Sequence, residues 1–154
     1  MQGIVAIEDL PVSVAGYLSA ASVTSDWRET ESLLLRAQAA DSKCLHVYYT
    51  LYKFYFNRNR LNDAENAACL ALNEAARQAN ITDDWRTLTI NTCDWTKVDS
   101  PQHFYLFSLK ALAFIRLRQN NKENAQLILA KLHEIDPQDS VGASVIEAYA
   151  AGAK

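Results

Sequence analysis

Apolar residues recur along this chain at intervals of three and four positions, which is the spacing of one face of an α-helix. Asp26 and Asn62 stand where helix N-caps are expected, and Pro137 ends the last strong segment. The expected helices, of which the first and the last show the weakest pattern, span residues 11–23, 27–40, 44–57, 62–78, 104–118, 122–134 and 140–151. The pattern predicts an all-α domain.

Residues 44–57 are the segment in which helix and strand compete. Their sequence, CLHVYYTLYKFYFN, is apolar almost all round and rich in aromatic and β-branched residues, which favour strands. The segment is long for a strand, however, and neither end carries Gly or Pro. The whole chain holds only 4 Gly and 3 Pro, too few for the many turns of an all-β protein. We therefore expect a helix here.

The second half of each predicted hairpin repeats along the chain. When the sequence is superposed on itself with a shift of 34 residues, and again with a shift of 61, small and apolar positions coincide. The aligned sets are Thr30, Leu34, Ala37 and Ser42; Ala64, Ala68, Ala71 and Ala76; and Ala125, Leu129, Leu132 and Pro137. Short helices joined by short turns pack as antiparallel hairpins, so the repeat predicts a stack of hairpins.

This pattern resembles the tetratricopeptide repeat (TPR) family, whose motif is a helix–turn–helix with small residues where its two helices touch. The resemblance implies a right-handed α-solenoid that takes up the whole chain as one domain. Repeats would span 11–44, 45–78 and 106–139, with an insert at 79–105 and a capping helix at 140–152. A Tyr-rich helix, a DWR segment and the stretch SLKALAFIRLR are also similar to small bacterial TPR proteins associated with nitrogen fixation.

The motif's turn glycine is absent from all three repeats. Ser25, Asn59 and Asn120 stand in its place. Asn tolerates the left-handed backbone conformation that the glycine provides, so these residues are expected to serve the same turns.

The resemblance also implies a concave groove lined by the first helix of each repeat. The groove positions of the second and third repeats are His46, Tyr49, Lys53, Phe56, Asn57, Phe107, Lys110, Phe114, Leu117 and Arg118, and those of the first are Val12, Ala15, Ser19, Ser22 and Val23. Aromatic faces flanked by Lys and Arg suit an acidic and partly apolar protein or peptide partner. The alternative is that Phe56, Phe107 and Phe114 pack against the insert or the capping helix.

The insert at residues 79–105 is the main departure from the repeat. It holds Trp85, Trp95 and Cys93, and loops of this length in a compact domain are uncommon and often functional. Two interpretations stay open: the tryptophans pack against the hairpins and close the gap between them, or the insert is a binding loop.

Composition narrows the possible partners and cofactors. The chain has 154 residues and a net charge of −3, which gives no general attraction to nucleic acid or anionic membranes. No apolar run is long enough to span a bilayer, and Glu8 and Asp9 interrupt the apolar start, so no signal peptide is expected. The 3 cysteines form no CxxC pair, which favours reduced thiols, two of them near buried helix faces, in a cytoplasmic protein without a metal site or cofactor.

The sequence contains no recognised catalytic motif. A nucleophile made of Cys93 and His103 is formally conceivable, but no supporting residue accompanies the pair. We therefore expect a protein-binding adaptor or chaperone-like scaffold and no enzyme. Two alternatives remain: a structural module that self-associates as a homodimer, and a small-molecule binder that uses the insert.

Overall fold

A computed structural model describes residues 10–152, and in that range it contains helices and no strand. The helices are α1 (Val12–Val23), α2 (Trp27–Ala40), α3 (Leu45–Asn57), α4 (Leu61–Ala79), α5 (Pro101–Arg118), α6 (Lys122–Ile135) and α7 (Ala143–Gly152), with a short 3-10 helix, η2 (Trp85–Thr87), between α4 and α5. The all-α prediction is confirmed for the described residues, and 44–57 is helical. The expectation that the chain has no signal peptide concerns mainly residues 1–9, which lie outside the described residues.

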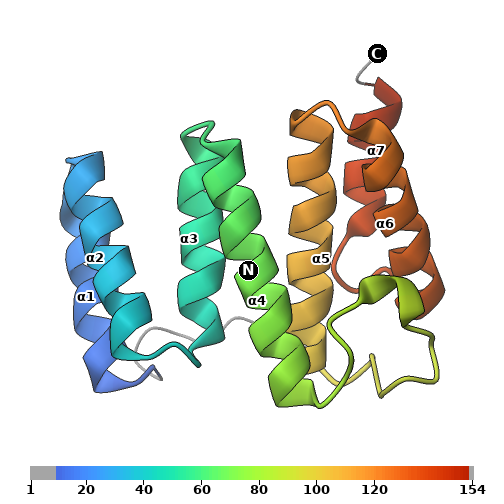
Figure 1. Cartoon of the computed structure of the whole chain (residues 1–154), viewed down its shortest axis with the longest axis horizontal. Helices are drawn as coiled ribbons and strands as arrows, with labels where there is room; N and C mark the ends of the chain where they lie inside the picture. The colour runs from blue at the N-terminus through green and yellow to red at the C-terminus, as the bar shows by residue number, and fades with distance from the viewer. Residues whose placement is uncertain (1–9, 153–154) are drawn as a thin grey trace.

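The helices are arranged in chain order along the long axis of the molecule, from the overlapping pair α1 and α2 on the left, through α3, α4 and α5, to the overlapping α6 and α7 on the right (Figure 1). Consecutive helices pack against each other along the row, and α5 also contacts α3 and α7. The connections within the pairs α1–α2, α3–α4 and α5–α6 are short turns, whereas a long segment, residues 80–100, joins α4 to α5. Order along the sequence is therefore also order in space.

Most helix ends lie close to their predicted positions, and local capping explains the exceptions. The Asp26 carboxylate accepts a hydrogen bond from the Arg28 amide at 3.0 Å, as expected of an N-cap. Asn62 is not a cap, because α4 already begins at Leu61. The last helix begins at 143 rather than 140.

Helix α5 begins earlier than predicted, and the insert is correspondingly shorter. Ser100 caps α5 through the His103 amide at 3.2 Å, and Pro101 occupies the first turn, where its missing N–H costs nothing. Residues 101–105 therefore belong to α5, and Ala79 belongs to α4. The insert contracts to residues 80–100.

Asparagine takes the role of the turn glycine in two of the three hairpins. Asn59 and Asn120 have φ angles of 59° and 63°, in the left-handed region. Ser25 is not among the residues with positive φ, so the α1–α2 turn uses a different backbone path. Sequence reasoning was therefore right about both Asn turns and wrong to extend the idea to Ser25.

Small residues let α4 pack closely against the helices on both sides. Ala64, Ala68, Ala71 and Ala76 are all buried, as the repeat predicts, and α4 contacts both α3 and α5. The matching residues of α6, Ala125, Leu129 and Leu132, are buried in the same way against α5. Alanine has no long side chain to hold neighbouring backbones apart, so these stretches permit close helix contacts.

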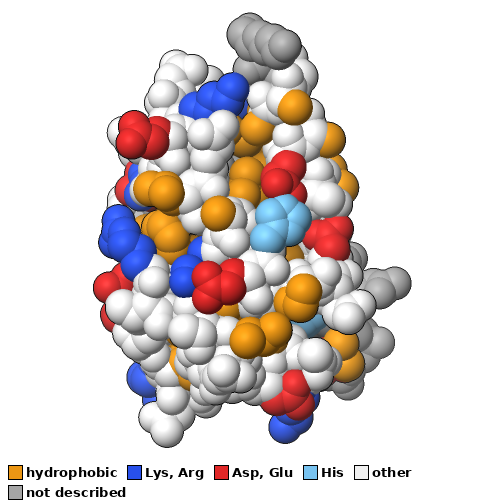
Figure 2. Space-filling model, turned by 90° about the vertical axis from the view of Figure 1, so that its right-hand side faces the viewer, with side chains coloured by type: hydrophobic (Ala, Val, Ile, Leu, Met, Phe, Trp, Pro, Cys, Tyr) orange, Lys and Arg blue, Asp and Glu red, His pale blue; other side chains and the backbone are white. Residues whose placement is uncertain are grey.

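The end formed by α6 and α7 presents a mixed surface, with apolar side chains scattered among charged ones (Figure 2). The His133 ring and the Glu147 carboxylate are in hydrogen-bonding contact across the two helices there. Val145 is exposed on the same end of the row. Lys110 Nζ, on α5, donates a hydrogen bond to the Val141 carbonyl at 2.6 Å and so fixes the chain just before α7.

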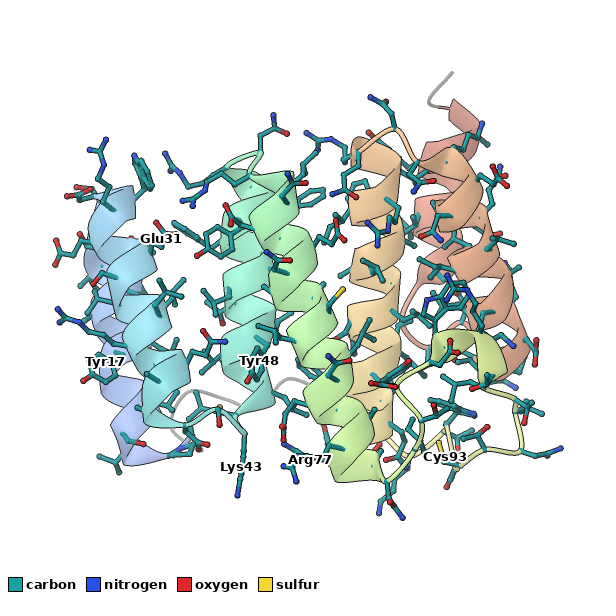
Figure 3. The ribbon with its side chains drawn as sticks, in the orientation of Figure 1. Tyr17, Glu31, Lys43, Tyr48, Arg77 and Cys93 are labelled. Atoms are coloured by element: carbon teal, nitrogen blue, oxygen red, sulfur yellow. The ribbon has the colours of Figure 1, made fainter. Side chains whose placement is uncertain are left out.

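Glu31 joins the first hairpin to the second. Its carboxylate accepts hydrogen bonds from the Tyr55 hydroxyl at 2.7 Å and from Arg60 at 3.1 Å, and it lies between α2 and α3 (Figure 3). Arg60 also pairs with Asp63 at 2.9 Å. The hydrogen bond from Arg60 lowers the pKa of Glu31, so the carboxylate stays charged in the folded protein.

Candidate binding groove

Two adjoining pockets lie on either side of α3. The α1–α3 pocket, of about 380 Å³, lies between the first hairpin and α3. The α3–α5 pocket, of about 250 Å³, lies between α3 and α5 and is completed by Ile146 of α7. Tyr49, Lys53 and Asn57 line both pockets. We call the two pockets together the groove.

The α1–α3 pocket combines apolar and hydroxyl-bearing walls. Its lining is Leu18, Ala21, Ser22, Thr30, Leu34, His46, Tyr49, Thr50, Lys53, Phe54 and Asn57. The Nδ1 atom of His46 is buried and has no hydrogen-bond partner within the described chain. Burial lowers the pKa of His46, so the ring is held neutral.

The α3–α5 pocket is mainly aromatic. Its lining is Tyr49, Tyr52, Lys53, Phe56, Asn57, Phe107, Lys110, Ala111, Phe114, Ile115 and Ile146. The Phe56 and Phe114 rings lie 4.8 Å apart between centroids, and Phe114 meets Tyr149 of α7 edge-on at 5.0 Å. Phe56 and Phe114 are only partly buried, so part of each ring stays accessible. Such a surface suits a large apolar side chain.

Positive charge borders the groove, and no carboxylate lines either pocket. Lys53 is exposed, with its Nζ 5.7 Å from the centroid of the Tyr49 ring. The Arg118 guanidinium lies 5.2 Å from the Phe56 ring and donates to the Asn59 side chain at 3.1 Å. Lys110 differs, because its amine is already engaged by the Val141 carbonyl. Burial also lowers the pKa of Lys110.

Eight of the ten side chains that the sequence singles out for the groove in the second and third repeats line at least one of the pockets, and Leu117 and Arg118 do not. Arg118 stacks on Phe56 at the edge of the groove. Phe107 is almost fully buried, and its ring centroid lies 5.1 Å from that of His103. It therefore forms part of the pocket lining but exposes little surface to a ligand. Of the first-repeat positions, only Ser22 lines a pocket.

Sequence reasoning allowed for Phe114 to pack on the capping helix, as it does through Tyr149, but it did not include α7 among the walls of the groove. Ile146 lines the α3–α5 pocket, and Tyr149 packs on Phe114 at its edge. The two residues are three positions apart and therefore share a face of the helix. That spacing was visible in the sequence, but only the packing of α7 against α5 turns the face toward the groove.

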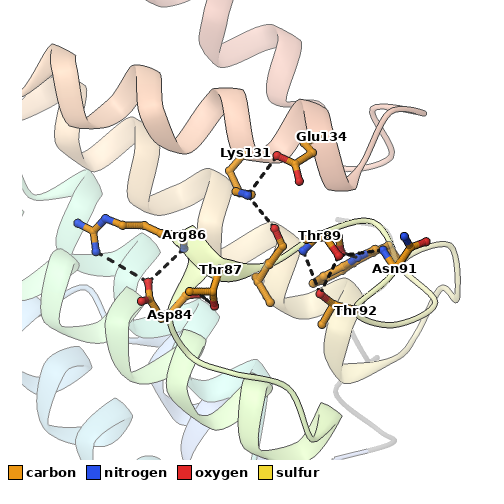
Figure 4. Close-up of polar contacts among 10 residues, drawn as sticks. Asp84, Arg86, Thr87, Thr89, Asn91, Thr92, Lys131 and Glu134 are labelled. Carbon is orange, nitrogen blue, oxygen red and sulfur yellow. Dashed lines mark hydrogen bonds and ion pairs between the residues drawn. The ribbon is translucent and has the colours of Figure 1, made fainter.

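The insert is packed into the core and lines neither pocket of the groove. Trp95 is 4% exposed, and its Nε1 donates to the Thr89 carbonyl at 2.9 Å. Leu88 is fully buried, and its carbonyl accepts a hydrogen bond from Lys131 of α6 at 2.7 Å (Figure 4). The structure therefore supports the part of the first interpretation in which the tryptophans pack against the hairpins. It does not support the closing of a gap, because α4 and α5 contact each other directly and η2 contacts α6.

Trp85 is less enclosed than Trp95. It lies in η2 and is half-buried. The Arg86 guanidinium lies 4.9 Å from the centroid of its ring. Asp84 caps η2 through the Arg86 amide at 3.1 Å. Trp85 packs against the same core cluster as Trp95, and it lines neither pocket of the groove.

The three cysteines are free and half-buried, and Cys44 and Cys69 pack against the core, as expected for positions on or beside buried helix faces. Burial raises the pKa of each thiol, which disfavours the reactive thiolate. No hydrogen bond joins Cys93 to His103 among residues 10–152, and His103 Nδ1 is buried without a partner. The described chain also brings together no group of three or more His, Cys, Asp or Glu side chains that could hold a metal ion.

Comparisons with known proteins return nothing for this chain: no family model, no curated protein and no solved structure matches it. Within residues 10–152, no helix combines the length and the apolar character needed to cross a membrane. Functional interpretation therefore depends on the residues and their geometry.

Proposed function

We propose that this protein is a non-catalytic binding scaffold that holds a protein or peptide partner in the groove on the inner face of a TPR-like, right-handed α-solenoid. One observation carries the proposal. The two pockets share Tyr49, Lys53 and Asn57 of α3, are lined by partly exposed aromatic rings, and have no carboxylate among their lining residues. Such a surface complements an acidic and partly apolar chain. The free cysteines are consistent with a cytoplasmic location.

The proposal predicts that a charge reversal in the groove removes the partner without unfolding the protein. Tagged protein is used to capture partners from its native cells, and the Lys53→Glu variant is compared with the unchanged chain by mass spectrometry. Lys53 is exposed and lies in the middle of the groove, so its reversal repels an acidic partner at little cost to folding. Circular dichroism checks that the variant retains its helices.

Lys43→Glu is the matched control. Lys43 is also exposed, and it lies in the connection between α2 and α3, away from the groove (Figure 3). The net charge of the two variants is identical, so a general electrostatic effect would appear in both. A partner that Lys53→Glu and Lys43→Glu retain equally contradicts the proposal.

A second candidate function is self-association through α1. This helix contains no charged residue, and Val12 and Val23, at its two ends, are 92% and 83% exposed. An uncharged, partly apolar helix at the end of a row offers a face for a second copy. Sedimentation at several protein concentrations, with Val12→Glu as the variant, tests it. A monomer at every concentration removes this candidate.

A further inference from the structure

The α3–α5 pocket contains a cation that the proposed function does not use. Lys110 of α5 is half-buried and lines this pocket, and its Nζ atom lies 5.3 Å from the centroid of the Phe107 ring, which also lines it. An ammonium group has three N–H donors. One of them binds the Val141 carbonyl at 2.6 Å, and Lys110 makes no other hydrogen bond within residues 10–152. Two donors therefore remain for a ligand.

The positive charge of Lys110 has little compensation from the protein. None of the ion pairs found in the described part of the chain includes Lys110, and no carboxylate lines the pocket. The Asp139 carboxylate acts on Lys110 at longer range, and it is engaged with the backbone N–H and the hydroxyl of Ser144. Burial lowers the pKa of Lys110, as expected of a cation taken out of water without a counter-ion. An anion bound beside Lys110 would offset part of this cost.

The rest of the pocket is apolar and small. Its volume of about 250 Å³ lies below the range of about 300–1,000 Å³ that is typical of pockets for drug-sized ligands. The Phe56 and Phe114 rings are partly open, and Ile146 of α7 completes the lining. A short alkyl chain or a single aromatic ring suits this space.

The donors of Lys110 favour a carboxylate over a phosphate. Two free N–H donors match the two oxygens of one carboxylate, which carries a single charge. A phosphate group brings three oxygens and a charge close to −2, and no arginine lines the pocket to bind them. Lys53 also lines the pocket, but it is exposed, so an ion pair with it contributes little.

We propose that the α3–α5 pocket binds a small apolar carboxylic acid, whose carboxylate pairs with the Lys110 amine. Its apolar body lies on Phe56, Phe114 and Ile146. This inference goes beyond the proposed function, because the ligand is a small molecule and its charge is held by Lys110, not by Lys53.

Matched pairs of acid and amide test the charge of the ligand. Octanoate is compared with octanamide, and 4-phenylbutyrate with 4-phenylbutyramide, by ligand-observed NMR titration of the full chain at pH 7. Each pair has the same apolar body, so the difference isolates the carboxylate. We expect each acid to bind about 5- to 10-fold more tightly than its amide, because a hydrogen bond to a charged group is the stronger one. Equal affinities, or no binding of either acid, overturn the proposal.

Two lysine variants test which amine holds the acid. Lys110→Met keeps the apolar stem and removes the charge, so the affinity for octanoate should fall to that for octanamide, while octanamide binds as before. Lys53→Met is the matched control, since it removes the same charge from an exposed position of the same pocket. It should change the affinity for octanoate less than about 2-fold. Equal losses in the two variants overturn the role of Lys110.

A reading from the unchanged chain guards against a loss of folding in Lys110→Met, because Lys110 also holds the chain before α7. The ε-carbon signals of ¹³C-labelled lysines are followed by NMR during titration with octanoate. The Lys110 signal should shift with the same dissociation constant that the ligand signals give, and the Lys53 signal should shift little. A shift of Lys53 without a shift of Lys110 overturns the proposal.

The failure of this inference is distinguishable from the failure of the proposed function. If small acids do not depend on Lys110, the inference is wrong, while a cellular partner that depends on Lys53 still supports the scaffold function. If capture from cells shows no dependence on Lys53, the scaffold function in this groove is wrong, whatever the small acids give.

Discussion

The groove and the insert contain the same kinds of residue, yet they use them differently. In the insert, Trp95 is enclosed, and its N–H is bound by the chain itself. In the groove, the Phe56 and Phe114 rings remain partly open, and the Lys53 amine has no carboxylate partner within the described chain. Lys131, beside the insert, illustrates the opposite case, because its amine binds both the Leu88 carbonyl and Glu134.

The difference shows that an unusual loop with tryptophans is a weak indication of function. A side chain whose hydrogen bonds and apolar surface are satisfied inside the chain contributes to stability. A side chain whose charge or apolar surface is not satisfied inside the chain is available to a partner. Changes in the insert should therefore lower stability, whereas changes in the groove should alter binding or titration.

The largest effect is expected from Trp95→Ala. Truncation of this buried ring should lower the free energy of unfolding by about 3–5 kcal/mol, through lost burial and the cavity left behind. Urea denaturation followed by circular dichroism measures it. Trp85→Ala, at the half-exposed position, is the control and should cost about half as much or less. Equal losses for the two variants would show that the insert is not anchored by Trp95.

A smaller effect is expected from Lys131→Met. Methionine keeps the apolar stem of the side chain but removes the amine that holds the Leu88 carbonyl. The buried carbonyl then loses its partner, so the free energy of unfolding should fall by about 1 kcal/mol. Lys97→Met, at an exposed position of the insert, should change the free energy of unfolding by less than about 0.5 kcal/mol. Urea denaturation of both variants checks this, and a loss shared by Lys97→Met would contradict the role of the hydrogen bond.

The smallest effect concerns His46 and pH. Burial lowers the pKa of His46 below its ordinary value of 6.5. As the pH falls, the His46 ring is therefore protonated at a higher pH in the unfolded chain than in the folded chain. The contribution of His46 to stability is therefore complete above pH 6.5 and is lost as the pH falls from there through the lower pKa of the folded state. His46→Gln removes this contribution.

Urea denaturation of both proteins at pH 7 and pH 5 gives the comparison. Carboxylates that titrate in the same range affect both proteins alike, so they cancel in the difference. The unchanged chain should lose more stability than His46→Gln between the two pH values. An identical loss would mean that the His46 ring is not shielded from water.

The quality of the sequence predictions varied with the range of the forces that decide each feature. The helix over 27–40 was predicted to the residue, because its cap and its apolar spacing are local. The left-handed turns at Asn59 and Asn120 were likewise readable, because they depend on one residue each. The start of α5 was missed, although Ser100 and Pro101 gave a local signal that could have found it.

The sequence alone determined the helices, their Asn turns and the small residues along α4, because helix formation and close packing depend on the spacing and size of neighbouring side chains. Only the tertiary structure decided that Trp95 is enclosed while Phe56 stays partly open, that Lys110 is engaged while Lys53 has no carboxylate partner in residues 10–152, and that α7 completes a pocket. The physical reason is that burial and hydrogen-bond partners are provided by segments distant in the chain. No local sequence pattern specifies which distant residues pack against a given side chain.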